Sequence, residues 1–158
     1  MRTPFPTTIA LLATLALTSG ALAAFLAEAP VAAGAYLALF PGLFAVRVVG
    51  QIGVAALRPR WLPPMDEWNL VPYRALLPAQ LVILALMGAI AIGYAEPGST
   101  LAQGLVASAL VYWAAMVVRY AVRMTRRPDQ RWLGGAIPIV FHCVLAAFLF
   151  VLGVSHAS

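Results

Sequence analysis

The chain has 158 residues, of which 63% are hydrophobic and only 9% are charged, and its formal net charge is +5. A soluble domain carries about 25% charged residues, so this composition excludes an ordinary soluble domain and indicates a single integral membrane domain. The basic residues are all arginines and form no nucleic-acid-binding motif, so we expect no nucleic-acid partner.

Five apolar stretches follow one another along the chain. Each reaches or approaches the roughly 20 residues that cross a bilayer as a helix. A helix is expected because it satisfies its own backbone hydrogen bonds in lipid. We therefore predict an all-α bundle of five transmembrane helices in one domain, residues 1–158. The predicted helices span residues 7–26, 30–57, 72–95, 100–122 and 133–154.

The first stretch has a second interpretation. Arg2, the apolar run from Ile9 to Leu17 and the small residues of Ala21–Ala23 also match a signal peptide that is cleaved before Ala24. Cleavage would leave four helices. We favour five, because the apolar run continues beyond this point to Leu26.

Arginines mark alternate connections between the predicted helices. Beyond Arg2 they are Arg58, Arg60 and Arg74 around the second connection, and Arg123, Arg126, Arg127 and Arg131 around the fourth. The other two connections carry Glu28 and Glu96. Positively charged loops stay in the cytoplasm, so we expect a cytoplasmic N-terminus and a C-terminus on the far side.

Small residues recur at four-residue intervals in three of the stretches. These ridges are Gly34, Ala38 and Gly42; Ala85, Ala89 and Gly93; and Gly104 and Ser108. Small residues allow close helix packing in lipid. We expect the ridges to pack inside the chain's own bundle. The alternative is a contact with a second copy or with another subunit.

Ionisable groups inside a membrane are costly, so each marks a candidate functional position. Six polar residues fall in the predicted cytoplasmic half of the bundle: Arg47, Gln51, Gln80, Tyr112, Arg119 and His142. We hypothesise that they line one intramembrane polar pocket. Arg47 has no acidic partner within the apolar stretches. Arg119 lies nearer the membrane surface. Its side chain could instead extend out of the pocket and place its charge among the lipid headgroups.

His142 has two candidate roles, a structural hydrogen bond or axial ligation of haem or another tetrapyrrole. His156 cannot provide a second ligand to the same pigment, because fourteen residues of continuous helix separate the two by roughly 21 Å. Cys143 is the single cysteine, and we expect it to be a small buried hydrophobe. No cluster of ligand residues predicts a metal site, and the sequence requires no cofactor.

Three segments resemble small bacterial membrane proteins of no assigned function. They are the residues WLPPMDEW at 61–68, PYRALLP at 72–78, and Ile137-Pro138 followed by Phe141-His142. The resemblance implies a polytopic protein of the bacterial inner membrane. It implies no activity and no functional residue.

The sequence contains no intramembrane carboxylate pair, nucleophile motif or phosphate-binding glycine loop, so we do not expect an enzyme. Our first hypothesis is a non-catalytic subunit or accessory factor of a larger membrane assembly, in contact with lipids and with other subunits or a second copy. One alternative is a transporter or channel for a small solute or anion, with Arg47 in the path. The other is a redox or lipid-acting protein that holds haem, a pigment or quinone near His142.

Overall fold

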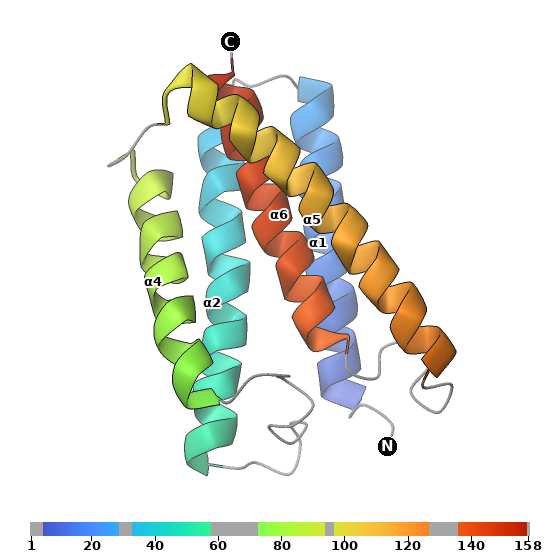
Figure 1. Ribbon diagram of the computed structural model, residues 1–158. Coiled ribbons are helices and arrows are strands. Elements are labelled where there is room, and N and C mark those ends of the chain that lie inside the picture. Colours follow the sequence, from blue (N-terminus) through green and yellow to red (C-terminus); the bar gives the residue numbers. More distant parts are fainter. Residues whose placement is uncertain (1–4, 29–32, 58–72, 94–96, 127–135, 158) are drawn as a thin grey trace.

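The computed structural model describes residues 5–28, 33–57, 73–93, 97–126 and 136–157 (Figure 1). These residues form five α-helices and no strand, so the predicted all-α bundle is confirmed. The helices are α1 (Phe5–Glu28), α2 (Ala33–Leu57), α4 (Tyr73–Ala91), α5 (Ser99–Arg126) and α6 (Ile137–His156). Most of the loop arginines that we used to predict the orientation lie outside the described residues.

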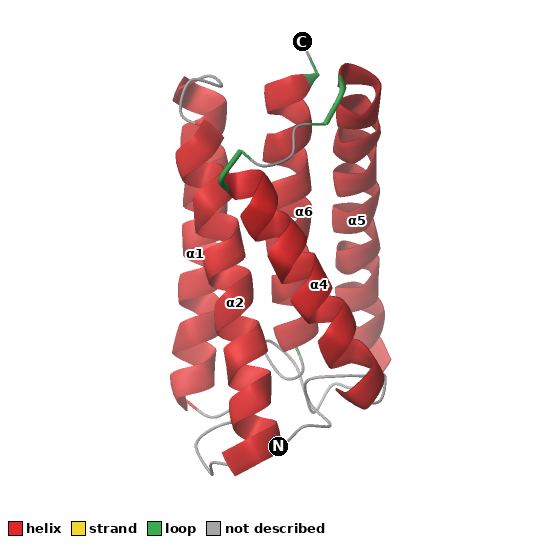
Figure 2. Cartoon of the chain, turned by 90° about the vertical axis from the view of Figure 1, so that its left-hand side faces the viewer, coloured by secondary structure: helices red, strands yellow, loops and turns green. Residues whose placement is uncertain are grey.

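Successive helices run in alternating directions, and the two termini lie at opposite ends of the bundle (Figure 1). Figure 2 shows that α4 crosses the bundle obliquely. Four helices, α1, α2, α5 and α6, are long and apolar enough to span a membrane. The apolar part of α4 is shorter, at Leu76–Ala91. The chain therefore has the helices of a polytopic membrane protein.

Most helix ends differ from the predicted ones by one to four residues, and two of these differences have a local cause. α4 ends at Ala91, before the predicted residue 95, because Gly93 adopts a positive φ of 75°. A residue in this conformation terminates a helix, and glycine adopts it without steric cost. α5 continues to Arg126, past the predicted residue 122. Its last turn contains Arg123 and Arg126, whose positive charges are favourable at the negative end of a helix dipole.

α6 is the central helix of the bundle. In its most apolar 18-residue window 67% of the residues are buried, whereas the corresponding share is 17% for α5. α6 packs against α5, α2 and α1, and α4 packs against α2. The outer helices expose large apolar side chains such as Val49 and Val111, while Arg47, Gln51 and Gln80 are buried. An apolar exterior with these polar side chains buried inside suits a lipid solvent.

The closest helix contact joins α5 and α6. Ala102, Ala109 and Met116 are buried at seven-residue intervals on α5, which is the spacing of a left-handed helix pair. A Cβ atom on Gly153 would lie 2.7 Å from the carbonyl oxygen of Ala102. Only glycine fits at this crossing, and no four-residue ridge in the sequence marked it.

The expectation that the small-residue ridges pack inside the bundle is wrong for most of their members. Ala89 is half-buried, and the other seven members are exposed: Gly34, Ala38, Gly42, Ala85, Gly93, Gly104 and Ser108. A Cβ atom on Gly34, Gly42 or Gly104 would have no neighbour within 4 Å. α2 instead packs through its larger side chains, among them Phe40 and Phe44.

α1 also has a specific buried face. Its buried residues alternate at four- and three-residue steps: Thr7, Leu11, Thr14, Thr18, Ala21 and Phe25. The hydroxyls of Thr14 and Thr18 donate hydrogen bonds to the carbonyl oxygens of Ala10 and Thr14, at 2.8 and 2.7 Å. The ring of Phe25 packs edge-on against Tyr36 of α2, with centroids 5.7 Å apart. α1 is thus joined to α2 through matched side chains.

Candidate functional site: a polar cavity between four helices

A cavity of about 90 Å³ lies where α2, α4, α5 and α6 face one another. Its polar lining residues are Arg47 of α2, Gln80 of α4, Tyr112 of α5 and His142 of α6. Its walls are otherwise apolar, with Phe44, Ile83, Phe141 and Leu145 among them. The structure therefore brings four of the six hypothesised pocket residues together, one from each helix.

Arg47 is the deepest charge in the described bundle. It is only 4% exposed, because it shares the buried face of α2 with Phe40, Phe44 and Gln51. Its Nε–H has no hydrogen-bond partner. The guanidinium carbon lies 5.8 Å from the centroid of the Phe141 ring, within the range of a cation–π contact. Arg47 therefore points into the protein, where the aromatic face replaces water only in part.

Gln80 lies opposite on α4 and is also 4% exposed. Gln80 and Met87 are the buried side chains of α4 within the part that the structure describes, and they lie two turns apart on one face. The Oε1 atom of Gln80 is buried and accepts no hydrogen bond. A buried polar atom without a partner costs about 1–3 kcal/mol of stability. The Oε1 atom of Gln80 is therefore available to accept a hydrogen bond from a ligand in this cavity.

The hydrogen bonding of His142 determines which ring nitrogen faces a ligand. Nδ1 is hydrogen-bonded to the carbonyl oxygen of Pro138, one turn earlier on α6. A carbonyl oxygen only accepts, so Nδ1 carries the proton and the neutral ring has an acceptor at Nε2. The ring of Tyr112 lies beside it, with centroids 5.5 Å apart. Both side chains are half-buried.

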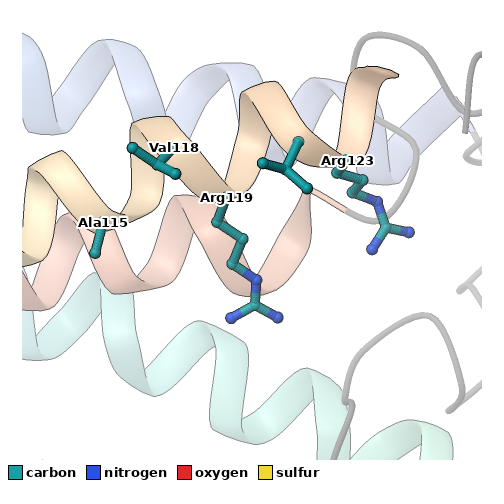
Figure 3. A pocket seen from close by; sticks show the side chains of 5 residues that line it. Ala115, Val118, Arg119 and Arg123 are labelled. Carbon is teal, nitrogen blue, oxygen red and sulfur yellow. The ribbon is translucent and has the colours of Figure 1, made fainter. Parts of the chain in front are cut away.

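The other two hypothesised residues lie outside the cavity lining. Gln51 is fully buried one turn beyond Arg47 on α2. Arg119 lines a separate open groove of about 500 Å³, together with Ala115, Val118, Val122 and Arg123 of α5. Figure 3 shows Arg119 and Arg123 projecting from the same side of α5.

Arg119 nevertheless acts on the cavity through its charge. It lies close enough to interact electrostatically with Arg47, Tyr112 and His142. None of the side chains that the structure describes is acidic. Within the described bundle, two guanidinium groups therefore repel each other without an acidic side chain between them. Such an arrangement favours a negatively charged group near the cavity.

The cavity does not fit a tetrapyrrole. Its volume of about 90 Å³ is far below the roughly 300–1,000 Å³ of pockets for drug-sized ligands. Cys143 is a free, half-buried thiol outside the cavity lining. In the described part of the chain no group of three or more histidine, cysteine or acidic residues is placed to bind a metal ion.

Sequence reasoning missed the aromatic wall of this site. Phe141 faces Arg47, and Phe44 lines the cavity one turn before it on α2. The available signal for Phe44 was its spacing, because residues three apart on a helix share a face. Phe141 had no comparable signal, since its contact with Arg47 arises between two helices far apart in the chain.

Comparison of the chain with known proteins finds no matching family model, no matching curated protein and no matching solved structure.

Proposed function

We propose that this protein is a non-catalytic membrane protein that binds a small anionic group in the cavity between α2, α4, α5 and α6. The observation that carries the proposal is the unpaired Nε–H of Arg47 at 4% exposure. A buried guanidinium needs a partner, because an uncompensated charge in a low-dielectric interior is strongly destabilising. The nearby charge of Arg119 adds a second attraction for an anion.

Thermal unfolding tests this proposal. The purified protein is heated in detergent with sodium salts of small anions at constant ionic strength. A ligand present at 100 times its Kd stabilises the folded state by about 2.7 kcal/mol, which raises the Tm. At least one anion should therefore raise the Tm of the wild type, and Arg47→Gln should abolish that increase. Arg47→Lys, which keeps the charge but lacks Nε, should retain a smaller one.

The matched control is Arg126→Gln, which removes an exposed arginine from the last turn of α5, outside the cavity. Arg126→Gln should retain the full increase in Tm. An increase that survives in Arg47→Gln, or the absence of any increase in the wild type, would count against the proposal.

Membership of a larger assembly is the second candidate function. The exposed ridge of Gly34, Ala38 and Gly42 on α2 favours it, because no helix of the described bundle covers this surface. Small residues of this kind allow a transmembrane helix of another chain to approach closely. Gly42→Leu should then release a co-purifying membrane subunit in native mass spectrometry. Gly20→Leu, at an exposed glycine of α1, is the control and should retain it.

We propose the bacterial inner membrane as the location, with the N-terminus in the cytoplasm. Arg123 and Arg126 end α5 at the same end of the bundle as the N-terminus, which supports this orientation under the positive-inside rule (Figure 1).

A further inference from the structure

We infer that the cavity selects an oxyanion that carries a proton, such as a phosphate or phosphate monoester with a free P–OH group. This inference rests on the proposed anion binding and adds a chemical class to it. It follows from the hydrogen-bonding groups that face the cavity from different helices.

The cavity combines a donor with acceptors. Arg47 offers the Nε–H, which has no partner. Gln80 offers the unpaired Oε1. His142 offers Nε2 as an acceptor, because its Nδ1–H is already bonded to the carbonyl oxygen of Pro138.

A ligand that satisfies these groups accepts a hydrogen bond from Arg47 and donates a hydrogen bond to Gln80 or His142. Chloride, sulfate and phosphodiesters carry the negative charge but have no proton to donate. A neutral alcohol donates but leaves the guanidinium charge uncompensated. A protonated phosphate does both, because its anionic oxygens accept and its hydroxyl donates.

The volume of the cavity sets the size of the bound group. A volume of about 90 Å³ suits a small group such as one oxyanion. The group can belong to free phosphate or to the terminal phosphate monoester of a membrane lipid. Both sources have the same P–OH chemistry, so the experiment must separate them.

The first arm uses soluble probes. Binding of methyl phosphate is compared with that of dimethyl phosphate, and binding of inorganic phosphate with that of sulfate, from the shift in Tm with concentration. We expect the probes with a P–OH group to bind at least tenfold more tightly than the two without one, because an unpaired buried acceptor penalises a ligand that cannot donate. Equal affinities in each pair would overturn the inference.

The second arm uses lipids. The protein is placed in nanodiscs that contain phosphatidic acid, a monoester, or phosphatidylglycerol, a diester, and retained lipid is measured by native mass spectrometry. A tenfold preference for phosphatidic acid, with no binding of inorganic phosphate, identifies the lipid source. Binding of inorganic phosphate without that preference identifies the free anion. Retention of phosphatidylglycerol at the level of phosphatidic acid, without phosphate binding, would overturn the inference.

Variants separate this inference from the proposed function. Gln80→Leu should reduce the preference for phosphate over sulfate to about threefold or less while sulfate affinity is unchanged. Gln103→Leu, which removes an exposed amide on α5, is the control and should keep the preference. Arg47→Gln should lose both anions. If the binding of every anion requires Arg47 but a P–OH group on the anion makes no difference, the inference fails and the proposed function stands. If no anion binds, both fail.

Discussion

The guanidinium of Arg47 on α2 lies over the ring of Phe141 on α6, with its central carbon 5.8 Å from the ring centroid. Such a contact contributes about 0.5–2 kcal/mol, with the larger values at desolvated sites. It joins α2 to the central helix at the cavity. It also orients the arginine without consuming the Nε–H, which stays available to a ligand.

A double-mutant cycle measures this contact. We expect Arg47→Met and Phe141→Leu to show a coupling free energy of about 0.5–2 kcal/mol in thermal or detergent-induced unfolding. The control cycle pairs Arg47→Met with Phe148→Leu, because Phe148 is fully buried on α6 outside the cavity lining. It should show no coupling beyond about 0.5 kcal/mol. Equal coupling in the two cycles would mean that Phe141 acts only through its size.

The crossing of α5 and α6 should not tolerate a methyl group. In Gly153→Ala the new Cβ would lie 2.7 Å from the carbonyl oxygen of Ala102 and 2.9 Å from the backbone nitrogen of Val106. Backbone atoms cannot rotate away, so the helices must separate, and we expect a loss of about 1–3 kcal/mol in the free energy of unfolding. Gly104→Ala, with open space around its Cβ, should lose nothing measurable. Similar losses in both variants would contradict the close contact.

The indole of Trp113 should contribute a small stabilisation to the same helix pair. Its Nε1–H donates to the carbonyl oxygen of Cys143 at 3.3 Å, and its ring contacts Phe150 at 5.5 Å between centroids. Hydrogen bonds between membrane helices contribute about 0.6 kcal/mol on average. We therefore expect Trp113→Phe to lower the free energy of unfolding by about 0.5–1.5 kcal/mol. Val117→Ala, at a side chain 68% exposed on α5, is the control and should change it less.

Cysteine labelling tests the proposed orientation. Cys143 is the single cysteine, so Cys143→Ala gives a background free of thiols. In this background we expect Thr125→Cys, near the end of α5, to react with a membrane-impermeant maleimide only after the cells are opened. Ser155→Cys, near the end of α6, should react in intact cells. The opposite labelling pattern would reverse the orientation.

Much of the fold follows from local properties of the chain. Stretches of about 20 apolar residues, separated by prolines, glycines and charges, were sufficient to predict five helices and their order. The helix ends were less accurate where one residue's backbone conformation decides them. Gly93 ends α4 through its positive φ, which the apolar pattern around it does not reveal.

The candidate site was accessible from the sequence only in part. A charged, amide or imidazole side chain is rare in an apolar stretch. Arg47, Gln80 and His142 could therefore be selected as candidate site residues without a structure. Their depth along each helix followed from the helical rise. The extent of the cavity did not, because it depends on how the four helices pack. Gln51 lies one turn beyond Arg47 and Arg119 lies two turns beyond Tyr112, and both fall outside the cavity lining.

The small-residue ridges show the same limit. Gly34 and Gly153 are both glycines in apolar helices, yet one has open space around it and the other touches the backbone of α5. In lipid the apolar side chains carry no preference for the interior, so hydrophobic pattern does not tell a lipid-facing surface from a protein-facing one. The sequence by itself determined the solvent, the helical content and the polar residues that need partners. Only the tertiary structure decided which faces meet, because that choice depends on close packing between helices distant in the chain.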